Sequence, residues 1–131
     1  MIDVAEFLMD NYYDKYPVSG LTVDLLKETL TRFSERVIVI SDEDKIVGVS
    51  VFVLLPDEKM HIVKDIKHVD MTKMVDLLES EGDNLHFLIV AAKGYSIIRQ
   101  GLRQVVGRYN PRTASWWNPT TTRFHNYKLG G

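Results

Sequence analysis

The sequence contains no cysteine, and residues 84–131 contain neither aspartate nor glutamate. Without cysteine there is no disulfide framework, no thiolate metal site and no cysteine nucleophile. The four histidines are scattered and lack the close spacing of a metal-binding helix, so no metal is expected. They are His61, His68, His86 and His125.

Long apolar runs are also missing, because no stretch approaches the roughly 20 apolar residues that a membrane span requires. The N-terminus carries Asp3, Glu6 and Asp10, where a signal peptide would carry a positive start and an apolar run. The sequence therefore predicts an intracellular, cytoplasmic protein that does not enter the membrane.

The acidic and basic residues are divided unevenly along the chain. Residues 1–83 hold all eighteen carboxylates beside nine Lys and Arg, a formal charge of −9, whereas residues 84–131 carry a charge of +7. Such asymmetry points to an anionic ligand, either a phosphate-bearing cofactor or a nucleic acid. The alternative is that the basic half only neutralises the acidic half. Aromatic residues interleaved with the basic ones favour a ligand. These are Tyr95, Tyr109, Trp116, Trp117, Phe124, His125 and Tyr127.

The length of 131 residues fits one domain, and the periodicity is mixed α and β. A capping box at Asp3 and Glu6 predicts a first helix, and Thr22 is placed to cap a second one. Residues 37–40 and 46–55 then predict a β-hairpin that Pro56 ends. Residues 57–69 fit no period, and helical spacing returns from Met71 to Leu78, with Gly82 as its stop.

A strongly apolar run from Leu85 to Ala92 predicts a central strand that is buried on both faces. The segment Lys93-Gly-Tyr-Ser96 follows it, and a helix is expected from Ile97 to Tyr109. A strand, a short glycine turn and a helix N-terminus direct unpaired backbone N–H groups and a positive dipole toward one point. This junction is therefore a candidate phosphate site. Lys93, Gly94 and Ser96 are its expected contributors.

The tail predicts a second hairpin, with Ser115–Trp117 and Arg123–Leu129 as strands and Asn118-Pro-Thr-Thr121 as the turn. The two tryptophans would then lie on opposite faces, one in the core and one partly exposed.

This order of elements, with the basic turn after the central strand, resembles the GNAT superfamily of N-acetyltransferases. Residues 118–130 (NPTTTRFHNYKLG) are similar to the family's Asn-x-x-Ala-x-x-Phe-Tyr-x-Lys-Leu-Gly segment. The resemblance covers about residues 22–130 and implies a pared-down or degenerate member, a form typical of short bacteriophage-encoded versions, for which a place in the virion is an alternative location. It implies one α/β (α+β) domain over residues 1–131, with a GNAT-like mixed central sheet flanked by helices.

The resemblance implies transfer of an acyl group from acetyl-coenzyme A to an amine. Backbone N–H groups near Val90 and Ala91 would hold the thioester carbonyl, and Lys93, Gly94, Tyr95, Ser96 and Arg99 would contact the coenzyme. His125 or Tyr127 would protonate the leaving thiolate. The turn contains one glycine where the family has a longer loop, and His125 stands where the family places its tyrosine. No carboxylate follows Asp83, so an acidic base would come from the predicted hairpin or from residues 57–83, and His86 or His125 is the alternative.

Two other classes of function stay open. The chain could be a non-catalytic structural or interaction protein that keeps the fold. It could also bind single-stranded nucleic acid, which requires an aromatic platform on a sheet and a basic groove.

Overall fold

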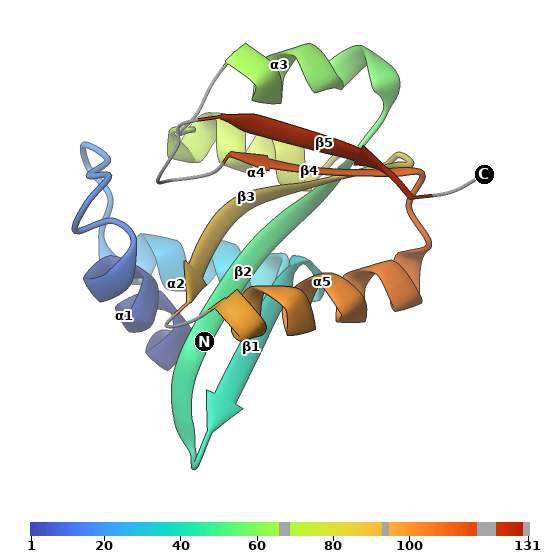
Figure 1. The fold of residues 1–131 in the computed structure, drawn as a ribbon. Helices are drawn as coiled ribbons and strands as arrows, with labels where there is room; N and C mark the ends of the chain where they lie inside the picture. The colour runs from blue at the N-terminus through green and yellow to red at the C-terminus, as the bar shows by residue number, and fades with distance from the viewer. Residues whose placement is uncertain (66–68, 93–94, 118–122, 130–131) are drawn as a thin grey trace. The chain divides into compact units, whose positions relative to one another are not determined.

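The computed structural model describes residues 1–65, 69–92, 95–117 and 123–129. The five strands of this part of the chain form one mixed sheet in the order β1-β2-β3-β4-β5 (Figure 1). The chain divides into two compact units, and both β2 and β3 contribute to each of them. One unit holds Met1–Val51 and Ile89–Gln104, and the other holds Phe52–Leu88 and Val105–Gly131.

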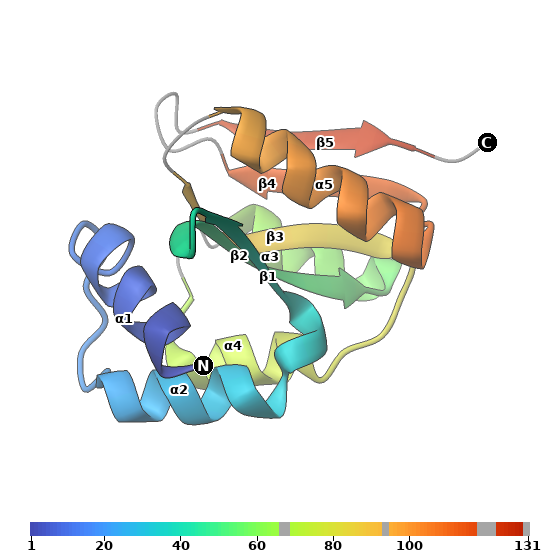
Figure 2. The same cartoon turned by 90° about the horizontal axis from the view of Figure 1, so that it is seen from below.

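The first unit opens with two helices, α1 (Ile2–Asn11) and α2 (Val23–Arg32), which pack against each other (Figure 2). The buried positions include Val4 and Leu8 of α1 and Leu26 and Leu30 of α2. Thr22 caps α2, because its hydroxyl oxygen accepts a hydrogen bond of 3.1 Å from the Leu25 backbone N–H. The capping box at Asp3 is wrong. α1 begins at Ile2, so Asp3 lies in the first turn of the helix. Its carboxylate interacts favourably there with the positive end of the helix dipole, but it does not cap the helix.

A short 3-10 turn, η1 (Ser34–Arg36), leads to the predicted hairpin of β1 (Val37–Asp42) and β2 (Lys45–Leu55). The strands are antiparallel, and Asp42 pairs with Lys45 across a two-residue turn. Glu43 and Asp44 have φ values of 50° and 64°, as a type I′ hairpin turn requires. The β2 strand ends at Leu55, so Pro56 terminates it as expected.

The second unit holds η2 (Asp57–Lys59), α3 (Met60–Asp65) and α4 (Met71–Leu78), followed by the first part of β3 (Asn84–Ala92). It also holds the end of α5 (Tyr95–Tyr109) and the strands β4 (Thr113–Trp117) and β5 (Phe124–Lys128). β3 pairs with β4 in parallel, and β4 pairs with β5 antiparallel. The Phe52 ring packs on Phe87 and Tyr109, with ring centroids 6.5 and 5.5 Å apart.

Several sequence expectations for the second unit change. Residues 57–69, which fitted no period, contain η2 and α3. Residues 66–68 of this stretch lie outside the described part of the chain. α4 ends at Leu78, four residues before Gly82, so this glycine is not the helix stop. A Cβ at Gly82 would instead meet the Leu55 carbonyl and the Pro56 nitrogen far inside van der Waals contact. Asp70 caps α4 by accepting from the Lys73 N–H.

The tail hairpin is confirmed, and its two tryptophans occupy successive positions on β4, so they face opposite sides of the sheet. Both are half-buried, so the expectation of one core tryptophan is wrong. The predicted turn at 118–121 lies outside the described residues. Among the described residues, no helix combines the length and apolar character that crossing a bilayer demands.

Candidate functional site

The junction of β3 and α5 lies in the first unit and contains the predicted coenzyme-binding residues. Ala91 of β3 is 4% exposed, and Val90 beside it is half-buried. α5 begins at Tyr95, two residues earlier than expected. The backbone of Tyr95 and Ser96 therefore belongs to the first helical turn, whose N–H groups have no partner within the helix. Lys93 and Gly94 lie outside the described residues.

The orientation of α5 in this unit follows from Gly101. A Cβ added there would lie 3.9 Å from side-chain atoms of Ile38 and Ser50, so this side of the helix rests on the β1–β2 hairpin. Arg99 and Arg103 are two residues before and after Gly101, and a rotation of about 100° per residue places both on the opposite side. Both are exposed, which confirms that they share a solvent-facing side.

The tail hairpin gathers three rings that we call the ring cluster: Trp116, His125 and Tyr127. Trp116 pairs directly with His125 across β4 and β5, and Tyr127 is two residues further along the same strand. Their ring centroids lie 5.3 to 6.2 Å apart, and their planes differ by 6° to 26°. Nε2 of His125 is buried and has no hydrogen-bond partner among the described residues. Tyr127 is 52% exposed.

His86 of β3 packs against the opposite face of the hairpin and is 2% exposed. Its Nδ1 lies 2.8 Å from Oγ of Ser115, and its ring stacks on Phe124 with centroids 5.9 Å apart. Burial lowers the pKa of His86 to about 3. A buried imidazole with so low a pKa is a poor proton acceptor at neutral pH, so we assign His86 a structural role. Trp117, on this same face, donates from Nε1 to the Val63 carbonyl at 2.7 Å.

This burial predicts a pH-dependent stability. The folded chain keeps His86 neutral down to about pH 3, whereas the unfolded chain binds a proton near pH 6.5. The unfolded state therefore binds more protons between these values, and the free energy of unfolding falls as the pH falls through that window. From pH 7.5 to 5.0 the loss due to His86 is about 2 kcal/mol.

Urea unfolding of the wild type, His86→Asn and His61→Asn at the two pH values measures this effect. His86→Asn is expected to be less stable at pH 7.5 but to lose about 2 kcal/mol less on acidification. His61→Asn is the control, because His61 is exposed on α3. An unchanged pH dependence in His86→Asn would contradict the assignment.

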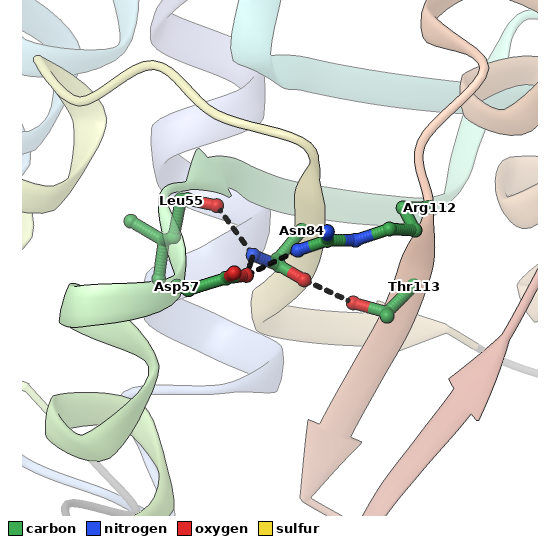
Figure 3. Close-up of polar contacts among 5 residues, drawn as sticks. All are labelled: Leu55, Asp57, Asn84, Arg112 and Thr113. Atoms are coloured by element: carbon green, nitrogen blue, oxygen red, sulfur yellow. Dashed lines mark hydrogen bonds and ion pairs between the residues drawn. The ribbon is translucent and has the colours of Figure 1, made fainter.

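The second unit also contains a polar network that is centred on Asn84 (Figure 3). The Asn84 amide donates to the Leu55 carbonyl at 2.9 Å and to Asp57 at 2.8 Å, and it accepts from the Thr113 hydroxyl at 2.8 Å. Arg112 forms an ion pair with the same Asp57 oxygen. One amide thus joins the end of β2 to the starts of β3 and β4.

This network bears on the uneven distribution of acidic and basic residues along the chain. Arg112 belongs to the basic part of the chain, but it pairs with a carboxylate of the acidic part, so at this residue the asymmetry is neutralised internally. No local sequence pattern indicates this ion pair, because Asp57 and Arg112 are 55 residues apart. The two sets of predicted site residues also lie in different units. Val90, Ala91 and Arg99 are in the first, and His125 and Tyr127 are in the second.

Two solved structures are similar to this chain. One is the GphF GNAT-like decarboxylase in complex with isobutyryl-CoA, with a TM-score of 0.60 and 14% sequence identity over 88% of this chain. The other is the loading GNATL domain of CurA from Lyngbya majuscula, with a TM-score of 0.59 and 14% identity over 89% of this chain.

The chain has a GNAT-like fold. The matches span 62% and 61% of the two solved chains, so this chain corresponds to about three fifths of each. No protein-family model matches the sequence, and no curated protein matches it. The GNAT-like fold confirms the mixed sheet flanked by helices that the family resemblance implied. Among the described residues, no group of three or more His, Asp or Glu side chains is placed to hold a metal ion.

Proposed function

We propose that this chain binds an acyl-coenzyme A at the junction of β3 and α5 and transfers its acyl group, from acetyl-coenzyme A, to an amine. The observation that carries the proposal is the direct passage from β3 to the 15-residue helix α5 through two residues, within a GNAT-like fold. The similar GphF structure contains isobutyryl-CoA, which supports a coenzyme A thioester as the ligand.

The residues at the junction suit a pyrophosphate. The free N–H groups of the first turn of α5 and the helix dipole favour an anion at this end. Arg99 is one turn further along and exposed, so its guanidinium is free to pair with a phosphate. In this proposal Lys93 and Gly94, which lie outside the described residues, contribute to coenzyme binding, and the backbone of Val90 and Ala91 holds the thioester carbonyl. The coenzyme supplies an activated acyl group.

His125 and Tyr127 are the candidates for the acid that protonates the leaving thiolate. The Tyr127 side chain is exposed, so its hydroxyl is open to a ligand. The Nε2 atom of His125 is buried and lacks a hydrogen-bond partner among the described residues, so Tyr127 is the more accessible of the two candidates. The low pKa of His86 removes it as the base. The amine's proton acceptor is therefore His125 or a carboxylate of the β1–β2 hairpin or of residues 57–83.

The similarity to a GNAT-like decarboxylase favours a second candidate reaction, the loss of carbon dioxide from a carboxyacyl-coenzyme A. Transfer to an amine releases free coenzyme A thiol, whereas decarboxylation leaves a shorter acyl thioester and no free thiol. Incubation with acetyl-coenzyme A plus an amine panel, and separately with malonyl-coenzyme A, distinguishes the two by their products. A protein that binds the coenzyme and yields neither product is a non-catalytic member of the fold.

Coenzyme binding is expected to raise the melting temperature in proportion to the logarithm of ligand excess. Arg99→Ala/Arg103→Ala should weaken this response roughly tenfold in ligand concentration, since each charged contact to phosphate contributes about 1 kcal/mol or more. It should change the stability of the free protein little, because both residues are exposed. Lys27→Ala/Lys45→Ala, with two exposed cations of the same unit removed, is the matched control. No thermal shift at millimolar coenzyme A would overturn the proposal.

A further inference from the structure

The sheet has an outer strand at each end, and within the described part of the chain each has one strand neighbour, β2 for β1 and β4 for β5. The Leu129 N–H donates to the Arg112 carbonyl at 2.9 Å, and Lys128 pairs with Thr113. Hydrogen-bonding direction alternates along an antiparallel strand. The backbone N–H and C=O groups of Asn126 and Lys128 therefore point away from β4. An unpaired row of such groups is a template for a further strand.

β1 is a regular strand at the opposite edge. The register of the β1–β2 pair shifts between Ile40 and Ser41, whose partners are Gly48 and Ile46. The extra residue is therefore Val47 of β2, so the irregularity lies in β2 and not in the outer strand. A bulge in the outer strand is one of the devices by which proteins protect an edge from pairing. In β1 this protection is missing over the described register.

Each outer strand also exposes a large apolar side chain. Val39 of β1 is 38% exposed and Tyr127 of β5 is 52% exposed, and no other large apolar side chain of the described strands is exposed. Leu129, directly after β5, is 42% exposed. A strand added to either edge would cover part of this surface, because side chains on neighbouring strands lie about 5 Å apart.

The two edges carry opposite charge. Residues 35–44, which comprise β1 and its flanks, hold four carboxylates and one arginine, a formal charge of −3. Residues 123–129, around β5, hold Arg123, Lys128 and no carboxylate, a charge of +2. Both cations are exposed, and neither forms an ion pair with another residue that the structure describes. One cation lies at each end of β5, so the acidic end of β1 at Asp42 meets a positive charge whichever way the two strands run.

We infer that the β1 edge of one molecule pairs with the β5 edge of a second copy, so that the sheet continues from one molecule into the next. The chain itself supplies both surfaces, which are opposite in charge and each carry an exposed apolar residue. Pairing two β5 edges would join strands that carry only cations, and pairing two β1 edges would join two acidic segments, so charge disfavours both. The contact is therefore head-to-tail, and each added copy leaves one edge of either kind available. The inference does not depend on the proposed coenzyme site.

Sedimentation velocity at low salt and rising protein concentration tests this inference with two edge variants and a control. Asn126→Pro removes a backbone N–H that points away from β4, a position at which an edge strand tolerates proline. Val39→Lys places a charge in the apolar part of the β1 edge, as edge lysines do in natural sheets. Leu25→Lys is the matched control, because Leu25 is as exposed as Val39, at 40%, but lies on the helix α2.

The wild type and Leu25→Lys are expected to form dimers and larger species as the concentration rises, whereas each edge variant alone should stay monomeric. An equimolar mixture of Asn126→Pro and Val39→Lys should form a dimer and no larger species. In that mixture the intact β1 of the first variant pairs with the intact β5 of the second, and the two remaining edges are blocked.

Charge reversal gives a second measurement that leaves the backbone unchanged. Arg123→Glu/Lys128→Glu should weaken the association of the wild type roughly tenfold or more. Salt at about 1 M should also weaken wild-type association, because the screening length falls to about 3 Å. Melting temperatures show whether each variant is folded, and if Asn126→Pro does not fold, this double variant takes its place in the mixture.

Four results would overturn the inference. They are a wild type that stays monomeric at low salt, unchanged association in Arg123→Glu/Lys128→Glu, a mixture of the edge variants without a dimer, and dimers of Val39→Lys alone. The last result would indicate pairing of two β5 edges. A monomeric wild type that binds a polyglutamate peptide would assign the β5 edge to an acidic partner protein, and it would equally overturn self-association.

Discussion

Replacing Gly82 by alanine is expected to destabilise the protein by about 3 kcal/mol or more and to lower the melting temperature by roughly 10 °C. An added Cβ would overlap the carbonyl of Leu55 and the nitrogen of Pro56. These are backbone atoms, so no side-chain rotation relieves the overlap. Either the segment after α4 or the end of β2 has to move.

The consequences of that movement extend beyond the contact itself. The Leu55 carbonyl accepts the Asn84 amide at 2.9 Å, and the same amide contacts Asp57. Displacing Leu55 therefore weakens a buried hydrogen bond and the network that joins β2, β3 and β4. An unsatisfied buried amide costs about 1–3 kcal/mol.

Gly107→Ala is the matched control for this experiment. Gly107 is in α5, where an added Cβ meets nothing within 4 Å. Alanine is the better helix former, so this variant should gain about 0.5–1 kcal/mol. Urea unfolding of both variants beside the wild type measures the difference. A Gly82→Ala protein as stable as the wild type would show that the close approach is not present in solution.

The sequence was sufficient to predict the elements whose structure is decided by neighbouring residues. The β1–β2 hairpin, the Thr22 cap and the end of β2 at Pro56 follow from local backbone preferences, and all were predicted. The helix start at Ile2 was missed because Asp3 and Glu6 have capping-box spacing, whereas the helix itself begins one residue before Asp3. Local spacing does not reveal where a helix begins when an apolar residue precedes the first polar one.

Contacts between residues that are far apart in the sequence could not be predicted from local patterns. The residues around Gly82 suggest that it ends a helix. Only its close approach to the backbone of Leu55 and Pro56 shows that a glycine is needed there for a different reason. The ion pair between Asp57 and Arg112 depends on the parallel pairing of β3 with β4, which no local pattern specifies.

The candidate site shows the same division. Alternation along the predicted strand Arg123–Leu129 implies that His125 and Tyr127 lie on one face. The addition of Trp116 depends on the register of β4 against β5, which the connecting residues set. The cluster of aromatic and basic residues after Asp83 was the signal that could have found it.

If the chain catalyses acyl transfer, removing the leaving-group acid should lower turnover by about 10²- to 10⁴-fold. The two candidates differ in what their replacement removes. Tyr127→Phe removes only a hydroxyl, since the phenyl ring keeps its place beside Trp116 and His125. His125→Ala also removes a ring from the cluster, so its effect has a structural part that the melting temperature reports.

A leaving-group acid acts chiefly in the transition state. The expected pattern is therefore a large fall in kcat with little change in coenzyme affinity. Release of free coenzyme A thiol measures kcat, and the thermal shift with coenzyme A measures affinity. Asn126→Ala is the control on the same strand, because its side chain faces the other side of the sheet. Equal loss of affinity and turnover would indicate binding in place of acid catalysis. A wild type that binds coenzyme A but releases no thiol with any amine would make the chain a non-catalytic member of the fold, because the proton donor would then have no reaction to serve.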